Sequence, residues 1–185
     1  MIFNRHSELE GLHAFLSASQ YHWLNYDLEK LESVYRNHVA TLRGTELHEF
    51  ASKAIKLGIR LKATKTTLNM FVNHAIDYAM NSEQVLYYSN NCFGTADAIS
   101  FRNNMLRIHD LKTGKTPASM NQLMIYAALF CLEYSVKPED IKMELRIYQS
   151  DIIAVCEPSP DEINHIMGII KEFDKKIEQL KQEEL

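Results

Sequence analysis

FGTADAISFRNNMLRIHDLKTGKTPASMNQLMIYAALFCL, residues 93–132, is the stretch that decides the fold. Its first half consists of two segments in which apolar and polar residues alternate, separated by Asn103-Asn104. Alternation with a period of two is typical of strands, and Asn tolerates the positive φ angles of a tight hairpin turn. The sequence therefore predicts a β-hairpin in which Arg102 pairs with Met105.

That register brings charged residues together at the open end of the hairpin. It puts Asp97 opposite Asp110 and Thr95 opposite Lys112. Two carboxylates so placed have Cβ atoms roughly 4.5–5.5 Å apart and repel each other. A divalent cation between them would remove the repulsion, and Lys112 would point into the same site.

The alternation also predicts which residues share the face of this site, and the face is apolar at its turn end. Its expected members are Thr95, Asp97, Ile99, Phe101, Leu106, Ile108, Asp110 and Lys112. A solvated edge hairpin whose charges have no function is the alternative interpretation. The Ile, Phe and Leu neighbours on this face favour the site, because a solvated face does not need them.

The hairpin and the helix after it resemble a known nuclease signature. Gly94-Thr95-Ala96-Asp97 is followed after twelve residues by Asp110-Leu111-Lys112, and then by Gln122-Leu-Met-Ile-Tyr126. This order resembles the PD-(D/E)XK superfamily in its RecB-like version, shared by phage exonucleases and CRISPR-associated RecB-type nucleases. The chain also resembles the compact phage or prophage exonucleases of this group.

An upstream helix offers a further candidate ligand. Residues 41–58 are expected to be helical, and spacing places four of them along one side: Gly44, His48, Ala51 and Ile55. A lone histidine on such a helix side is more often a packed core residue than a ligand. The sequence from Gly44 to Glu49 is similar to the family's Gly-Thr-x-x-His-Glu motif, and this likeness favours His48 as a ligand. Glu49 lies 100° further around the helix and is assigned no role.

The resemblance implies a metal-dependent hydrolase of phosphodiester bonds in DNA. Asp97, Asp110 and His48 would bind Mg²⁺ or Mn²⁺ together with the backbone carbonyl of Leu111. Lys112 would orient the attacking water or balance charge on the phosphorus. Two further catalytic residues, Gln122 and Tyr126, would hold the metal shell or the DNA backbone; alternatively they are a polar pair that satisfies a buried helix end.

In many relatives an iron–sulfur cysteine follows an N-terminal Ser-x-Ser…Trp-Leu element, which residues 17–24 resemble. Here Asn25-Tyr26-Asp27 occupies that position, so no iron–sulfur cluster is expected. The three cysteines are odd in number and far apart, and they form no CxxC pair. They are expected to be small buried residues in a reducing compartment.

The net charge of −4 does not by itself indicate a nucleic-acid-binding protein. A metal site supplies its own positive charge, so binding confined to one cleft remains compatible with this balance. Basic residues after the His48 helix, with Lys115 and Thr116 in a loop, are candidates for contacts to DNA phosphates. The basic residues are Lys53, Lys56, Arg60, Lys62 and Lys65. A solvated helix face is the alternative explanation for them.

A chain of 185 residues, 46% hydrophobic and 24% charged, fits one ordinary globular domain. No apolar run approaches the length of a membrane span, and no signal-peptide pattern begins the chain. We therefore expect a cytoplasmic protein of a bacterial host cell without a membrane partner. DNA is the expected partner. Further candidate partners are a recombination or single-strand-binding protein and other copies of this chain in a homo-oligomer.

The order of elements predicts an α/β fold of the restriction-endonuclease-like type, with a mixed central β-sheet flanked by helices and a helical N-terminal region. Within one nuclease domain, residues 1–84 are expected to be mainly helical, in helices over 27–39, 41–58 and 66–84. Residues 85–156 hold the sheet and one buried helix, 118–134, and residues 159–180 form a closing helix.

The predicted function is DNA cleavage with little sequence specificity, by an exonuclease of phage or prophage recombination or DNA processing. The alternative is a catalytically quiet member of the same fold that binds DNA or protein as a subunit or inhibitor.

Overall fold

The structure is a computed structural model that describes Ser7 and residues 12–183. The chain divides into two compact units, Met1–Arg43 and Gly44–Leu185. Within the described part, no helix has the length and apolar character that a membrane crossing requires. All predicted metal-binding and catalytic residues belong to the second unit. The expectation of a single domain stays a prediction.

The first unit contains a short 3₁₀ segment, η2 (Ala18–Asn25), and the beginning of α1 (Leu28–Leu57). The indole of Trp23 donates a hydrogen bond of 2.9 Å to the backbone carbonyl of Ser17. The prediction of two separate helices in this region was wrong, because α1 continues without interruption. Thr41 lies at the expected break, yet its hydroxyl donates to the carbonyl of Asn37 one turn earlier, at 3.0 Å.

The second unit is built on one mixed sheet, which confirms the predicted α/β class. Its five strands are β1 (Asn81–Ser89), β2 (Cys92–Arg102), β3 (Met105–Leu111), β4 (Lys142–Gln149) and β5 (Ile152–Cys156), hydrogen-bonded in that order. All neighbouring pairs are antiparallel except β3 and β4, which are parallel. A parallel pair needs a crossover connection, and α3 (Asn121–Glu133) provides it.

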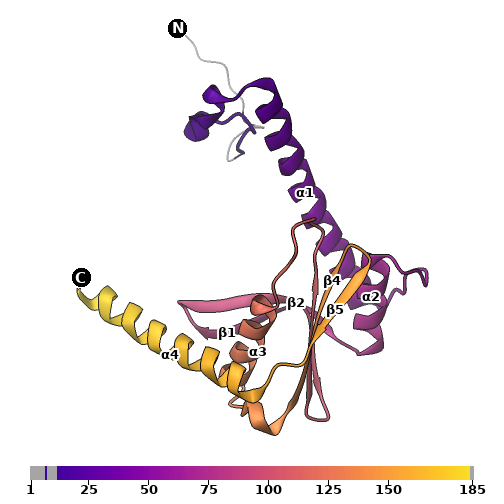
Figure 1. The fold of residues 1–185 in the computed structure, drawn as a ribbon, viewed down its shortest axis with the longest axis vertical. Helices are drawn as coiled ribbons and strands as arrows, with labels where there is room; N and C mark the ends of the chain where they lie inside the picture. The colour runs from indigo at the N-terminus through magenta and orange to yellow at the C-terminus, as the bar shows by residue number, and fades with distance from the viewer. Residues whose placement is uncertain (1–6, 8–11, 184–185) are drawn as a thin grey trace. The chain divides into compact units, whose positions relative to one another are not determined.

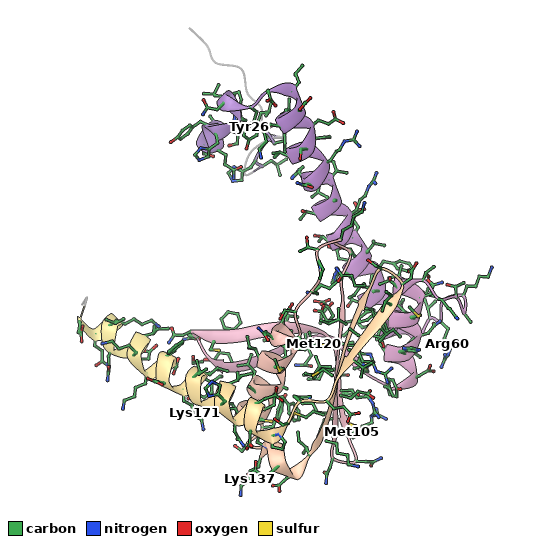
Figure 2. The ribbon with its side chains drawn as sticks, viewed as in Figure 1. Tyr26, Arg60, Met105, Met120, Lys137 and Lys171 are labelled. Carbon is green, nitrogen blue, oxygen red and sulfur yellow. The ribbon has the colours of Figure 1, made fainter. Side chains whose placement is uncertain are left out.

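Helices cover both faces of this sheet, and side chains fill the space between the layers (Figures 1 and 2). The predicted buried helix is confirmed as α3, which packs on one face together with α4 (Pro160–Glu183). The opposite face packs against α2 (Thr67–Asp77) and the part of α1 that includes Ala51 and Ile55. Asp97 on β2 and Asp110 on β3 therefore lie on strands that are held between two apolar layers, whereas Gln122 and Tyr126 lie on α3.

The predicted hairpin turn is confirmed. Asn103 and Asn104 have φ angles of 51° and 58°. The register between β2 and β3 runs from the pair Arg102–Met105 to the pair Ala98–His109, as predicted. The turn residues therefore fix the register of the two strands that carry Asp97 and Asp110.

The predicted boundary between the helical part and the sheet was wrong by four residues. The helix expected over 66–84 ends at Asp77, and β1 begins at Asn81 instead of residue 85. Ala79 adopts a φ of 46°, and the amide of Met80 donates to the carbonyl of Ala75 at 2.8 Å. This is a Schellman C-cap, in which glycine is the usual left-handed residue. Because alanine occupies that position, the sequence carries no stop signal there.

The closing helix has the start that its sequence predicts. Ser159 and Glu162 form a reciprocal capping box, in which the Ser159 amide donates to the Glu162 carboxylate at 2.8 Å and the Glu162 amide donates to the Ser159 hydroxyl at 3.3 Å. The helix then runs three residues beyond the predicted end at residue 180.

Candidate metal centre

The alternation of strand β2 is broken at Asp97-Ala98. Ala96 and Ile99 pack into the core beside α3, whereas Ala98 packs into the core beside α1 and α2. Asp97 lies beside His48 of α1. Two successive residues therefore lie toward the same layer, and the prediction that Asp97 and Ile99 share a face was wrong. A regular strand would have placed the Asp97 carboxylate on a different face from Ala98.

Strand β1 has a matching irregularity directly opposite. The register of β1 and β2 places Glu83 across from Asp97, and Glu83 has a φ of 53°. Its neighbour Ser82 is buried and lies 3.0 Å from the hydroxyl of Ser52 on α1. The positive φ allows Glu83 to lie toward α1 as well, so both strands present a carboxylate to that helix.

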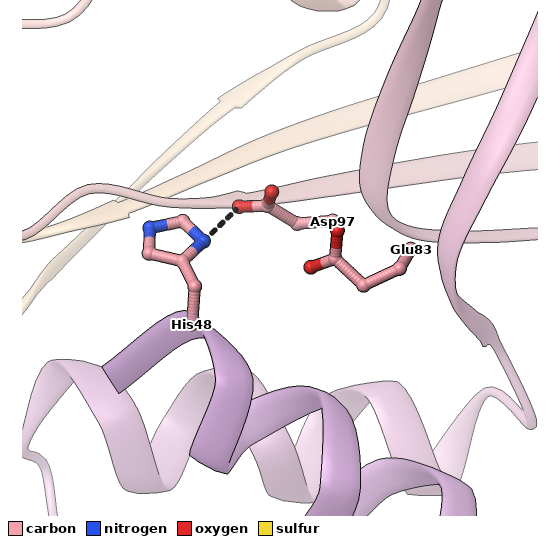
Figure 3. A group of neighbouring side chains, drawn as sticks. All are labelled: His48, Glu83 and Asp97. Atoms are coloured by element: carbon pink, nitrogen blue, oxygen red, sulfur yellow. Dashed lines mark ion pairs between the residues drawn. The ribbon is translucent and has the colours of Figure 1, made fainter. Parts of the chain in front are cut away.

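His48, Glu83 and Asp97 consequently form a compact group, the metal trio. Each offers a ligand atom, and these atoms all lie within 4.8 Å of one another. Figure 3 shows the imidazole of His48 on α1, joined by the dashed line to the carboxylate of Asp97, and the carboxylate of Glu83 beside Asp97. His48 was predicted as a ligand from its motif, and the structure brings it to Asp97: Nδ1 lies 3.3 Å from Oδ2.

The charges in the trio perturb each other. The hydrogen bond to Asp97 raises the pKa of His48 above 6.5, and burial opposes this effect. Partial burial and the charge of Asp97 raise the pKa of Glu83. The carboxylate of Asp97 contributes to both shifts, through a hydrogen bond to His48 and through its negative charge beside Glu83. A cation bound there would relieve the repulsion and would displace the proton from His48.

Strands β2 and β3 separate at the site. Their last backbone pair is Ala98–His109, and the next predicted pair, Asp97–Asp110, does not form. In its place the amide of Leu111 donates to Oδ2 of Asp97 at 2.8 Å. The expected direct opposition of two carboxylates was therefore wrong in detail, because the Asp97 side chain replaces a backbone acceptor. This bond fixes the Asp97 carboxylate between the two strands.

Asp110 lies on the other side of this separation and is 2% exposed. Burial, followed by the charge of Asp97, raises its pKa. The ammonium of Lys112 lies 3.0 Å from Oδ2 and donates to Oδ1 at 3.2 Å. Within the described residues, Oδ2 has no partner of hydrogen-bond geometry. A buried carboxylate that is paired with one ammonium group and lies close to the charge of Asp97 suits coordination to a cation.

A chain of hydrogen bonds continues from Asp110 to α3. Lys112 donates to the amide oxygen of Gln122 at 2.8 Å, and the amide nitrogen of Gln122 donates to the hydroxyl of Tyr126 at 3.0 Å. Gly94 permits this arrangement, since a Cβ at that position would lie 2.9 Å from Cε1 of Tyr126. Four residues of the predicted motif are therefore connected by hydrogen bonds, namely Asp110, Lys112, Gln122 and Tyr126.

Residues 68–181 match a family model described as "Protein of unknown function (DUF2800)". The chain belongs to this family. No curated protein and no solved structure matches the chain. The DUF2800 region contains Glu83 and Asp97 as well as the group from Asp110 to Tyr126, whereas His48 precedes it.

Three of the predicted DNA contacts precede the DUF2800 region, namely Lys53, Lys56 and Arg60, and two lie within it, Lys115 and Thr116. Lys53 and Lys56 are exposed on α1, and the charge of Lys56 lowers the pKa of Glu83, so this lysine lies near the trio. Arg60 forms an ion pair with Asp77 on α2, which makes it a poorer candidate for phosphate.

The remaining predicted contacts lie in the loop after β3. Lys115 lines a cavity of about 330 Å³ together with Lys112 and Gly114. Thr116 is exposed, and its backbone carbonyl accepts a hydrogen bond of 2.9 Å from the Gln149 side chain. That bond holds the loop in place, and the contact of Thr116 with DNA stays a prediction.

Sequence reasoning missed Glu83. The residue was expected at the end of a helix, because the Ala79 cap carries no glycine signal. Only its alternation with Val85 and Tyr87, read as a strand that begins at residue 81, would have placed it opposite Asp97.

Proposed function

We propose that the chain is a divalent-metal-dependent nuclease that hydrolyses DNA phosphodiester bonds, with a restriction-endonuclease-like fold of the RecB-like PD-(D/E)XK type. The observation that carries the proposal is the metal trio next to the buried carboxylate of Asp110 and its lysine partner. A trio of this kind alone indicates only a cation site. The adjacent lysine adds a group that can act on a substrate.

The donor atoms suit a hard divalent ion. Carboxylate oxygens from Glu83, Asp97 and Asp110 suit Mg²⁺, and the imidazole of His48 makes Mn²⁺ equally suitable. The burial of the Asp110 carboxylate and the raised pKa values of Glu83 and Asp110 support this fit. The carbonyl of Leu111 stays a predicted ligand, and its amide already holds Asp97.

When bound, the ion polarises the phosphate and lowers the pKa of an attacking water. The side chains contribute positioning. Lys112 is held between Asp110 and Gln122, so its ammonium can orient the water or balance negative charge on the phosphorus. Tyr126 fixes Gln122 and thereby the direction of the lysine.

Exonucleolytic action with little sequence preference, in phage or prophage recombination or DNA processing, completes the proposal. It follows from the resemblance to compact phage exonucleases. Lys53 and Lys56 are the candidates for phosphate contacts, since both are exposed on the helix that carries His48.

The test is degradation of end-labelled linear, circular and single-stranded DNA by the purified chain in Mn²⁺. We expect cleavage by the wild-type protein and its loss in Asp110→Ala and Lys112→Ala. Lys142→Ala, which removes an exposed lysine of β4, is the matched control and should cleave normally. Undiminished cleavage by both site variants would refute the proposal.

A catalytically quiet binding protein of the same fold is distinguished by a calorimetric Mn²⁺ titration. The wild-type protein could bind Mn²⁺, lose this binding in Asp97→Ala, and cleave none of the three DNA forms. That result would favour the catalytically quiet binding protein and refute the nuclease.

A further inference from the structure

The ribbon formed by β1 and β2 continues outward from the metal trio with an exposed face. After the Glu83–Asp97 row, the register gives the pair Val85–Thr95 and then the pair Tyr87–Phe93. The alternate residues of the ribbon lie toward α3: Leu86 and Ala96 belong to that core, and Gly94 contacts Tyr126. Because side chains alternate along a strand, the two outer rows lie on the face that carries the trio.

Besides Thr95, these outer rows consist of exposed apolar and aromatic side chains. Val85 is 48% exposed, Tyr87 45% and Phe93 62%. The rings of Tyr87 and Phe93 lie 28° from parallel with centroids 6.4 Å apart. Exposed aromatic residues grouped in this way are typical of binding surfaces, and no side chain in these two rows is charged.

Distance and charge relate this surface to the trio. Phe93 lies four residue steps from Asp97 along β2, which is about 13 Å at 3.3 Å per step. That length corresponds to about four stacked nucleotides at 3.4 Å each. Lys56, which lies near Glu83, and Lys53 supply positive charge on the neighbouring helix. A polyanion that reaches the trio along the ribbon would therefore meet aromatic rings first and lysines beside the site.

The form of nucleic acid follows from the chemistry of the rings. In a duplex each base is already stacked on its neighbours, so an exposed ring gains little from contact with it. Unpaired bases present a free π-face, and aromatic side chains stack on them without preference for sequence. The surface therefore fits a single strand better than a duplex.

We infer that Tyr87 and Phe93 form a base-stacking platform that guides single-stranded DNA to the metal trio. This inference rests on the proposed nuclease function and adds its substrate form. Tyr87 and Phe93 bind the strand and have no part in the chemical step.

The test measures binding apart from cleavage. Fluorescence anisotropy of a labelled 20-nucleotide single strand, in EDTA and at low salt, reads binding to the full chain without metal-dependent cleavage. Loss of one stacked base should weaken binding by about 5- to 150-fold in Tyr87→Ala and in Phe93→Ala. Tyr87→Phe keeps the ring and should bind within about twofold of wild type. The matched control is Tyr134→Ala, since Tyr134 is 52% exposed at the C-terminal end of α3, on the opposite face of the sheet.

Two further comparisons separate stacking from charge. A strand of abasic nucleotides should bind the wild-type protein no better than it binds Tyr87→Ala, because it keeps the phosphates and lacks the bases. Duplex DNA should bind the wild-type protein and both alanine variants equally. A melting curve followed by circular dichroism confirms that each variant is folded.

Each way of failing has its own result. Alanine variants that bind the single strand like wild type would overturn the platform, and the proposed nuclease would stand if Mn²⁺ still supports cleavage. Equal weakening on single-stranded, abasic and duplex DNA would also overturn it. Variants that change the mass of the particle in solution, with binding unaltered, would show that the face joins two copies of the chain. The protein could show all the expected differences in binding and still cleave no DNA in Mn²⁺. That result would refute the proposed nuclease function and leave the platform as a DNA-binding surface.

Discussion

Replacing Glu83 by glutamine tests the residue of the metal trio that sequence reasoning did not find. The substitution keeps the size and one oxygen donor of the side chain but removes its negative charge. Glu83 offers its oxygen within 4.8 Å of the donor atoms of His48 and Asp97. If the three side chains bind one ion, the loss of this charge should weaken that ion's binding directly.

The size of the effect follows from the position of Glu83 at the edge of the site. A divalent ion and a unit negative charge 4 Å apart attract by about 2 kcal/mol in water and about 8 kcal/mol near a protein surface. Because Glu83 is exposed, the lower part of this range applies. We expect a loss of about 2–3 kcal/mol, which is a 30- to 150-fold weaker Mn²⁺ affinity.

Isothermal titration calorimetry with Mn²⁺ at constant pH measures this loss. Glu49→Gln is the matched control, since Glu49 adjoins His48 in sequence on α1, is exposed, and carries the same charge outside the trio. It should bind Mn²⁺ within about twofold of wild type. Equal losses in Glu83→Gln and Glu49→Gln would show only a general effect of charge and would refute the trio as a ligand group.

Three further perturbations test other parts of the structure. The pKa of His48 is raised above 6.5, and only its neutral form could coordinate a metal ion. If His48 is a ligand, Mn²⁺ affinity should increase with pH through that raised pKa, and His48→Gln should flatten the dependence in calorimetric titrations. Gly94→Ala places a Cβ 2.9 Å from Cε1 of Tyr126 and should lower the free energy of unfolding in urea by about 1–3 kcal/mol. Gly168→Ala is the control, because Gly168 has open space around it inside α4, and it should raise that free energy by about 0.5–1 kcal/mol. An unchanged unfolding midpoint for Gly94→Ala would contradict the close approach. Asn104→Val forces a β-branched residue to a φ of 58° and should lower the free energy of unfolding by about 1–2 kcal/mol in the same assay. Asn104→Gly should leave the free energy of unfolding unchanged. Equal stability of the two variants would mean that the turn does not need a positive φ.

Local chemistry explains why the hairpin could be predicted. Asn103-Asn104 is a short-range signal, since the positive φ angles it adopts are those that Asn tolerates. Once the turn was placed, the register from Arg102–Met105 to Ala98–His109 followed by counting. The α/β class followed from the contrast between short alternating segments and the long, continuously apolar segment that forms α3.

The irregularities at the site could not be read from the sequence. Asp97 and Ala98 lie toward the same layer because α1 supplies His48 for one and an apolar surface for the other, and these contacts are distant in sequence. Glu83 depends on a positive φ that its residue type does not favour. Tertiary contacts decide both positions, so a rule of strict alternation fails at the residues that would bind the metal.

The prediction of function went only as far as its motifs. The register of the hairpin indicated Asp97, Asp110 and Lys112, and the resemblance indicated His48. The structure brings these four residues into one neighbourhood. Among the basic candidates, nothing in the sequence distinguished Lys56 from Arg60. The ion pair of Arg60 with Asp77 separates them, and it joins residues of two different elements.

The central claim is that this constellation cleaves DNA with a bound divalent ion. The most direct measurement follows end-labelled single-stranded DNA in Mn²⁺ with the wild-type chain, with Asp110→Ala, and with EDTA added to the wild-type chain. We expect degradation that requires the metal and is lost in Asp110→Ala. Cleavage that persists at the wild-type rate in Asp110→Ala, or no cleavage of any DNA form by a folded protein that binds Mn²⁺, would contradict it.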